Sequence, residues 1–518
     1  MRVRDGLLAV LALGLAALSA WNWRQIDQAV RRELHVVDGV PIELFLPLDA
    51  RPLTPALVIS HGFSGNRQLM YGFGYVLARN GYVAALVDFA GHGLSRDRLP
   101  DGFNDAQYRK LAANLDTALR FVRARPEVDA VRVGLLGHSM GATAVARYAA
   151  ERDDVPLTVA ISLGAFGSSL PPDPARPRNL LVLVGALEFE GFLRGSTNAL
   201  RVAWPQGIAN QTYGDFAAGT ARRLVIVPGV EHITVLFSDS AHQEVVRWLD
   251  QAFGVIRAGT LHADGRMVWV LGWYAAVLLG FFPLSRALLG RPDQPPTYPV
   301  GLSALHALLV MTLAVGGAAL ALWLGLIPYR WIPLTVGNYV GAFFAVAGGI
   351  VLGHQLACNR RVAAIVAGLS LASFARSALP ALLLAAYAVF TFGIAAHLAW
   401  SNFALVGARL WVFGVLWVSC FLFFLGDELL TRGALARRLV LWAATKLVVL
   451  IGLALAVLWL GAPPFLLLLI PVMVVLFVWH GAYAHRLYQL TAGALHGALL
   501  NTSVFAWVIA ATFALVAA

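Results

Sequence analysis

The chain has 518 residues, of which 59% are hydrophobic before glycine is counted and only 13% are charged. Soluble proteins carry roughly 45–50% apolar and about 25% charged residues, so this composition excludes a fully soluble protein, a disordered chain and a coiled coil. Residues 1–265 hold 26 basic and 25 acidic residues, whereas residues 266–518 hold 13 and 3. Nearly all of the net charge of +11 therefore lies among long apolar runs, where it indicates membrane topology, and we expect no nucleic-acid partner.

Residues 1–25 predict a transmembrane helix that anchors the chain. Two arginines precede an apolar run over 6–23, which has about the length that crosses a bilayer. A cleaved signal peptide is the alternative, because residues 17–19 fit a signal-peptidase site. Two tryptophans at the end of the run are typical of a membrane interface and favour the uncleaved anchor. In either case we expect residues 26–265 to lie outside the cytoplasm.

Residues 26–265 alternate short, β-branched apolar runs with amphipathic stretches. This pattern is typical of a mostly parallel sheet flanked by helices. The expected strands lie at 34–46 (a hairpin), 56–60, 83–88, 131–136, 157–163, 180–184 and 224–227. The expected helices include 104–124, 141–151 and 240–253.

Residues 266–518 predict an all-α transmembrane domain of about eight helices. With the N-terminus inside, nine arginines fall on the cytoplasmic side of these spans and three outside, which supports this topology. A shorter apolar run at 362–376 is interpreted as a surface or re-entrant segment. We expect an integral protein of a bacterial plasma membrane. The expected spans are 267–285, 301–328, 332–355, 378–400, 408–427, 438–461, 464–484 and 492–516.

The most specific motif is Gly137-His138-Ser139-Met140-Gly141. It follows the apolar run VRVGLL and precedes the helix-prone run ATAVARYAA. This is the context of a nucleophile elbow, in which a serine occupies a tight turn between a strand and a helix. Small residues on both sides allow the backbone to pack closely there.

A second motif, His61-Gly62-Phe63, follows the expected strand ALVIS. In this position we expect one half of an oxyanion hole, with the backbone N–H groups of Phe63 and Met140 directed at the developing negative charge. His61 itself is interpreted as structural.

Two titratable residues lie three positions beyond a glycine at the end of an expected strand. Glu188 follows Gly185, and His232 follows Gly229. Open α/β sheets build their sites at these carboxyl ends. The chain order Ser139, Glu188, His232 is the order expected of this fold.

Together these motifs resemble the α/β-hydrolase superfamily, and within it dienelactone-hydrolase-like and prolyl-oligopeptidase-like esterases, over about residues 34–253. The resemblance implies that Ser139 is the nucleophile, His232 the general base and acid, and Glu188 the residue that orients the imidazole. Aspartate is commoner than glutamate at the third position, so Glu190 and Asp239 are rivals. No metal or organic cofactor is implied. Residues 190–220 are a candidate cover for the site, with Phe192, Trp204 and Tyr213 as candidate wall residues.

Several ionisable residues lie within the expected membrane spans, where such groups are costly unless they are paired or functional. The stretch from Asp427 to Arg432, which includes Glu428, resembles the first motif of the CAAX-protease and bacteriocin-processing family. The segment with His496 and Asn501 resembles that family's last motif. This resemblance implies an intramembrane site, to which Lys446 and His480 are further candidates.

The leading hypothesis is a membrane-embedded serine hydrolase of carboxylesterase or lipase type. It would cleave an ester, thioester or related acyl bond through an acyl-enzyme on Ser139. The expected partners are a small-molecule or lipid ester and membrane lipid. One alternative is a transporter or lipid-binding membrane protein with an accessory hydrolase-like domain. The other is an intramembrane protease-like site at Glu428 and His496.

Overall fold

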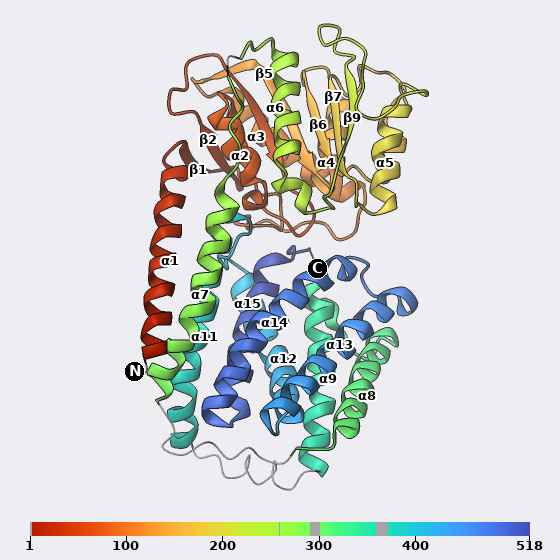
Figure 1. The fold of residues 1–518 in the computed structure, drawn as a ribbon. Coiled ribbons are helices and arrows are strands. Elements are labelled where there is room, and N and C mark those ends of the chain that lie inside the picture. The colour runs from red at the N-terminus through yellow and green to blue at the C-terminus, as the bar shows by residue number, and fades with distance from the viewer. Residues whose placement is uncertain (1–2, 258, 291–300, 359–370, 518) are drawn as a thin grey trace.

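The computed structural model describes residues 3–257, 259–290, 301–358 and 371–517. An α/β part (residues 31–257) is stacked on a helical part (residues 266–517), as Figure 1 shows. The N-terminal helix α1 (Val3–Asp27) runs beside the helical part and packs on its first helix, α7 (Arg266–Leu289). The fold class predicted from the sequence is confirmed.

The described residues of the α/β part form one sheet of nine strands in the order β1-β2-β4-β3-β5-β6-β7-β9-β8. The predicted hairpin is β1 and β2, which pair antiparallel. Six strands run parallel, namely β3, β4, β5, β6, β7 and β9. The two-residue β8 forms one edge of the sheet and is antiparallel to β9. The strands are β1 (Arg31–Val37), β2 (Val40–Leu46), β3 (Thr54–Ser60), β4 (Val83–Val87), β5 (Val128–His138), β6 (Thr158–Ile161), β7 (Leu180–Gly185), β8 (Thr212–Tyr213) and β9 (Arg222–Val227).

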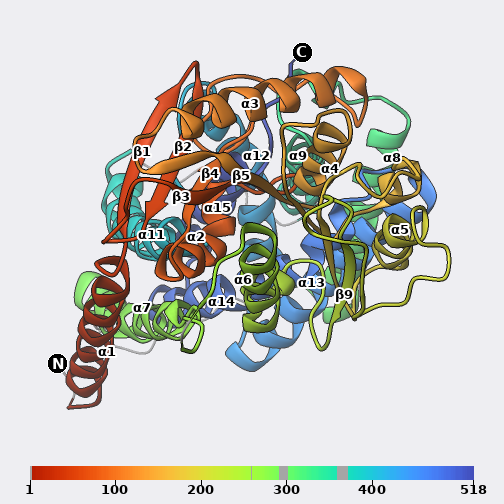
Figure 2. The same cartoon turned by 90° about the horizontal axis from the view of Figure 1, so that it is seen from above.

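Helices cover both faces of this sheet because its central strands alternate their side chains between two apolar cores. In β3, Leu57 and Ile59 face one core, whereas Ala56 and Val58 face the other. The first core is closed by α2 (Tyr71–Arg79) and α6 (Asp239–Phe253). The opposite face is covered by α3 (Asp105–Arg123), α4 (Met140–Ala150) and α5 (Glu190–Arg201), which Figure 2 shows from above.

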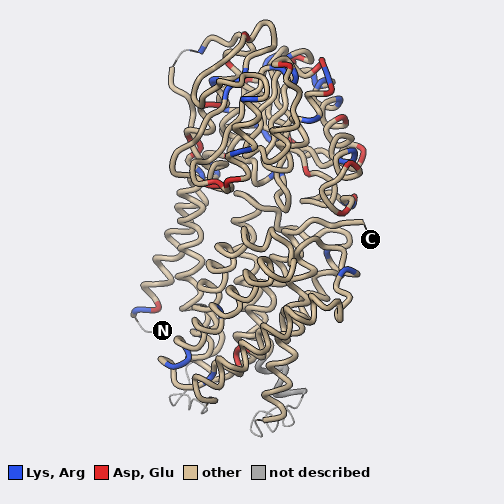
Figure 3. Tube along the Cα trace, turned by 90° about the vertical axis from the view of Figure 1, so that its right-hand side faces the viewer, with Lys and Arg blue, Asp and Glu red and all other residues tan. Residues whose placement is uncertain are grey.

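Nine helices of the described residues are long and apolar enough to cross a membrane. Figure 3 shows that Lys, Arg, Asp and Glu gather in the α/β part and near the helix ends, and that the middle of the bundle is almost free of them. The helices after α7 are α8 (Ala304–Trp323), α9 (Gly337–Cys358), α11 (Leu371–Ala399), α12 (Arg409–Leu430), α13 (Leu435–Leu460), α14 (Leu466–Thr491) and α15 (Ala494–Thr512).

The short run at 362–376 is only partly described. Residues 362–370 lie outside the described residues. Residues 371–376 begin α11 and continue without a break into the apolar span that starts at Ala378. These six residues are therefore continuous with the span, and their interpretation as a surface or re-entrant segment stays a prediction.

Main-chain hydrogen bonds join the α/β part to the helical part. The segment after α15, residues 514–517, lies between a loop of the α/β part and the loop before α9. Leu515 donates its N–H to the Gly91 carbonyl at 2.8 Å and accepts from the Leu99 N–H at 2.9 Å. On its other side, Val516 donates to the Pro333 carbonyl at 3.1 Å. The two parts therefore share one continuous set of backbone bonds.

A buried guanidinium strengthens the same junction. Arg409, the first residue of α12, donates to the Gly91 carbonyl at 2.7 Å and to the Phe513 carbonyl at 2.8 Å. Because buried polar groups are costly unless they are bonded, these contacts fix the position of the α/β part over the helices.

Candidate active site

Ser139 lies on a strained turn between β5 and α4. Its φ is 55° and its ψ is −113°, in a region that side-chain-bearing residues rarely adopt. A Cβ on Gly137 would lie 2.2 Å from the Gly141 carbonyl oxygen, and one on Gly141 would lie 2.6 Å from the His61 carbonyl oxygen. Only glycine fits at both positions, so the G-x-S-x-G spacing is a packing requirement of this elbow.

Ser139, His232 and Glu188 form one chain of hydrogen bonds. His232 Nε2 lies 3.1 Å from Ser139 Oγ, and His232 Nδ1 lies 2.6 Å from Glu188 Oε1. His232 and Glu188 are buried, and they come from the loops that follow β9 and β7. These strands are parallel neighbours, so their carboxyl ends meet at one edge of the sheet.

The two rival acids lie elsewhere. Glu190 is the exposed first residue of α5 and lies 3.8 Å from Arg194, one turn further along the same helix. Asp239 is the exposed first residue of α6. The structure therefore brings only Glu188, among the three candidate acids, to His232.

The predicted oxyanion donors lie on both sides of the elbow. Met140 is the first residue of α4, so its N–H has no acceptor within the helix and lies at the positive end of the helix dipole. On the other side, a Cβ on Gly62 would lie 3.1 Å from Ser139 Cβ, which places the turn containing Phe63 against the serine. The assignment of the two amides as oxyanion donors stays a prediction.

The histidine of the second motif has a structural place, as expected. His61 Nδ1 donates to the Gly62 carbonyl at 2.8 Å, and its Nε2 accepts from the Phe89 N–H at 3.1 Å. Burial lowers the pKa of His61 below its usual value, which keeps the ring neutral. It therefore ties the turn after β3 to the loop after β4.

Two residues near the catalytic chain were not found by sequence reasoning. Ser162 donates its hydroxyl to Glu188 Oε2 at 2.8 Å, and His138 Nε2 donates to the His232 main-chain carbonyl at 2.9 Å. Burial lowers the pKa of His138 well below its usual value, so it acts as a neutral donor. A polar residue at the end of a buried strand was the available signal for Ser162, which follows β6 directly.

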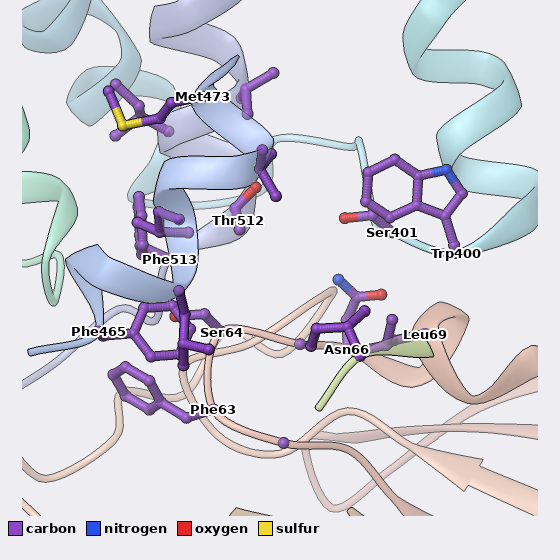
Figure 4. A pocket seen from close by; sticks show the side chains of 18 of the residues that line it. Phe63, Ser64, Asn66, Leu69, Trp400, Ser401, Phe465, Met473, Thr512 and Phe513 are labelled. Atoms are coloured by element: carbon purple, nitrogen blue, oxygen red, sulfur yellow. The ribbon is translucent and has the colours of Figure 1, made fainter. Parts of the chain in front are cut away.

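The catalytic chain opens into a cavity that lies between the α/β part and the helical part. Ser139 and His232 line one side, and residues of α9, α14, α15 and the α11–α12 connection line the other. Figure 4 shows Met473, Thr512 and Phe513 of the helical part facing Phe63 and Asn66 of the turn after β3. The cavity has a volume of about 200 Å³.

The expected cover from residues 190–220 is largely replaced by these helices. Phe192 does contact the site, since its ring centre lies 4.4 Å from that of His232. Trp204 and Tyr213 instead stack on each other at 5.7 Å and do not line the cavity. They belong to the apolar core under α5, and their prediction as wall residues is wrong.

The ionisable residues of the membrane spans are arranged differently from the catalytic chain. Glu428 pairs with Arg438 at 2.7 Å, and Asp427 pairs with Lys446 at 2.5 Å. A Cβ on Gly497, the residue after His496, would lie 2.9 Å from the Glu428 carboxyl group, so α12 and α15 do meet there.

His480 contacts the rings of Phe392 and Tyr483 at centroid distances of 6.0 and 5.7 Å. Within the described ranges, no group of three or more His, Cys, Asp and Glu side chains could hold a metal ion. Asn501 is buried on α15, one turn beyond Gly497. The protease-like site at Glu428 and His496 stays a prediction.

The mostly parallel sheet, the strained serine elbow and the Ser-His-Glu chain define a class. The N-terminal part of this protein is a serine-hydrolase-like α/β hydrolase.

Comparisons with known proteins agree with this class. Residues 52–187, about a quarter of the chain, match the family described as "Serine aminopeptidase, S33". "Thiohydrolase apmlB" of Arthrinium phaeospermum is 32% identical over 132 residues, which are 25% of this chain and 41% of that relative. The chain thus spans less than half of that relative's length.

Solved structures with a similar fold include a dienelactone hydrolase from Anabaena variabilis, at 19% identity and a TM-score of 0.33. The similarity covers 44% of this chain and 100% of that one. A glucuronoyl esterase from Solibacter usitatus is 15% identical with a TM-score of 0.32, over 44% of this chain and 83% of that one.

Proposed function

We propose that this protein is a membrane-embedded serine hydrolase that cleaves an ester, thioester or related acyl bond through an acyl-enzyme on Ser139. The observation that carries the proposal is the hydrogen-bonded chain from Glu188 through His232 to Ser139, which ends at a cavity. Similarity to a relative named as a thiohydrolase supports thioesters beside oxygen esters.

In the first half-reaction, Ser139 Oγ attacks the carbonyl carbon of the substrate, and His232 Nε2 takes the hydroxyl proton. Glu188 orients the ring and stabilises the imidazolium that forms. The substrate carbonyl oxygen becomes an oxyanion that the Phe63 and Met140 amides stabilise. The bond to the leaving oxygen or sulfur then breaks, and His232 returns its proton to that atom, so an alcohol or thiol departs.

In the second half-reaction, a water molecule attacks the acyl carbon and His232 takes one of its protons. When the tetrahedral intermediate collapses, the bond from carbon to Ser139 Oγ breaks and the proton passes to that oxygen. A carboxylic acid is released and the serine is restored. Ser162 and His138 are positioning residues, because they bond Glu188 and the His232 backbone and touch no reacting atom.

We assign residues 1–25 to an anchor helix, 26–265 to an extracytoplasmic hydrolase domain and 266–518 to a transmembrane domain. The distribution of arginines supports this orientation, since positive residues prefer the cytoplasmic side. Arg266, Arg330 and Arg409 lie at the helix ends next to the α/β part. By the bounds of the helices, Arg286, Arg432, Arg437, Arg438 and Arg486 lie at or near the helix ends on the far side.

The test of this function needs no knowledge of the substrate. The purified protein in detergent is treated with a fluorophosphonate probe, and the wild type is compared with Ser139→Ala and His232→Ala. We expect labelling of the wild type and its loss in both variants. An unlabelled wild type that is folded would overturn the proposal.

A further inference from the structure

The cavity beside Ser139 extends much further into the helical part than the cleavage of an acyl bond requires. Its lining follows α14 from Leu468 to Leu476 and the end of α15 from Phe505 to Phe513. Eight residue steps correspond to about 12 Å along each helix at the α-helical rise. Among the described residues that line it there is no Lys, Arg, Asp or Glu. The space is therefore a deep apolar site with the serine at one end.

Polar groups gather only at the serine end of this site. The Oδ1 atom of Asn66 and the hydroxyl of Ser64 are buried and have no hydrogen-bond partner in the described part of the protein. Figure 4 shows the Asn66 amide pointing from the turn after β3 toward the side chains of Ser401 and Thr512. Buried polar groups without partners are costly. These atoms are suited to a ligand that is polar near Ser139 and apolar further in.

A second cavity lies on the other side of a thin wall. Phe63, Phe465 and Leu468 line both cavities, and the rings of Phe63 and Phe465 meet edge to face at 5.2 Å. Unlike the first, the second cavity holds charged side chains, those of Asp101 and Arg330, together with the amides of Gln107 and Asn338. Asp101 and Arg330 are exposed, so this outer cavity is in contact with solvent.

We propose that the inner cavity holds the long acyl chain of the substrate between α9, α14 and α15, and that the polar leaving group departs through the outer cavity. The inference rests on the proposed function and names its substrate class: long-chain acyl esters or thioesters taken up from the membrane. The acyl group stays bonded to Ser139 after the first half-reaction, so it occupies the space that this serine lines. A polar alcohol or thiol has to reach water, and among the described residues the outer cavity offers it charged walls that the inner cavity lacks.

The test uses nitrophenyl esters that differ only in acyl length, acetyl against palmitoyl, with the full-length protein in detergent. Met473 lies in the inner wall of α14, and Met473→Trp shortens the cavity. We expect the ratio of palmitoyl to acetyl kcat/KM to fall about ten-fold or more. Met473→Phe fills less of the space and serves if the tryptophan variant does not fold; it should lower the same ratio by less.

The matched control is Val475→Trp, on the same helix but with a side chain that is 58% exposed on the outer face. It should keep the wild-type ratio. An unchanged ratio in both Met473 variants overturns the inference, and so does an equal fall in the control.

The last arm of the test moves the long chain from one side of the ester bond to the other. Ethyl palmitate carries it on the acyl side, and hexadecyl acetate carries it on the alcohol side. Faster cleavage of ethyl palmitate supports an acyl-chain site. Faster cleavage of hexadecyl acetate overturns the inference, because the cavity would then hold the alcohol chain. These outcomes are separate from failure of the proposed function. A protein that hydrolyses the acetyl ester but gains nothing from a longer chain keeps its serine chemistry and loses only this inference.

Discussion

Two groups of buried titratable residues, one in each part of the molecule, differ in whether their hydrogen bonds lead to a cavity. In the α/β part, Glu188, His232 and Ser139 form an open chain whose last hydroxyl lies in a cavity. In the helical part, Asp427 and Lys446 form a closed pair among apolar side chains. The open chain can pass a proton to a ligand in the cavity, whereas the charges of the Asp427–Lys446 pair are bonded to each other.

The second pair of the helical part is also an ion pair, although Glu428 Oε1 has no hydrogen-bond partner within the described residues. The Glu428 carboxylate meets the Arg438 guanidinium, which lies 4.3 Å above the ring of Tyr488. Closed pairs of this kind neutralise charge that the interior would otherwise exclude. Burial and charge alone therefore do not mark a catalytic site.

The largest effect, on catalytic rate, is expected from replacing Glu188, the acid of the hydrogen-bonded chain. Glu188→Gln replaces the acceptor of the His232 Nδ1 proton with an amide, which disfavours the required tautomer. We expect kcat to fall by on the order of 10³–10⁴-fold, measured with the acetyl nitrophenyl ester. Glu190→Gln is the matched control and should keep activity near that of the wild type. If Glu190→Gln is the harmful change, the acid has been assigned to the wrong residue.

The next largest effect is a loss of folding stability when the Asp427–Lys446 pair is broken. Lys446→Met leaves the Asp427 carboxylate buried without its partner, which costs about 3–5 kcal/mol. The double variant Asp427→Leu/Lys446→Met should recover most of the loss, because neither charge is then buried. Thermal unfolding in detergent measures both. A variant that unfolds like the wild type yet no longer reacts with the fluorophosphonate would show that this pair takes part in the chemistry.

A smaller effect on catalytic rate is expected at Ser162, which holds the Glu188 carboxylate in place. Ser162→Ala removes the hydroxyl that donates to Glu188 Oε2, and hydrogen bonds to charged groups contribute about 1.5–3 kcal/mol. We expect kcat/KM to fall by roughly ten-fold. Ser196→Ala removes another buried hydroxyl, bonded to the Leu163 carbonyl, and should leave the rate unchanged. Equal losses in the two variants would argue for a general packing defect.

The smallest effect per residue is a loss of stability in acid. Burial lowers the pKa of His61, His92, His138 and His242 in the α/β part. As pH falls below about 6.5, the unfolded chain binds protons on these histidines and the folded chain does not, so folding becomes less favourable. Each contributes up to about 1.4 kcal/mol per pH unit until its folded pKa is reached. The Tm of the α/β part should therefore fall between about pH 7 and pH 5; a flat profile would contradict this.

Local patterns in the sequence were sufficient for most of the sheet and for the elbow. The parallel strands carry continuous apolar runs, and the glycines at 137 and 141 mark a close approach of the backbone that the structure contains. Helix α2 was not predicted, because Gly72 and Gly74 weaken its helical pattern. Their missing side chains make room for His242 and Phe45, which come from distant parts of the chain. The two residues of β8 are too few to show a period.

The composition of the site was predicted less completely, because spacing alone does not fix tertiary contacts. The strand ends favoured Glu188 with Glu190 and Asp239 as rivals, and only the fold placed one of these acids beside His232. The walls supplied by α9, α14 and α15 lie hundreds of residues from Ser139 along the chain. No local pattern connects residues so far apart, so the cover was assigned to the nearer segment 190–220.

The segment 514–517 also has a consequence for the order of assembly. A ribosome makes these residues after all the described residues that line the cavity beside Ser139, and they form the backbone bonds that connect Gly91 and Leu99 to the loop before α9. The α/β part can fold as soon as its own strands are complete. The contact between the α/β part and the bundle is complete only after α15 has been inserted, so a chain inserted without α15 would carry the Ser-His-Glu residues without their apolar enclosure.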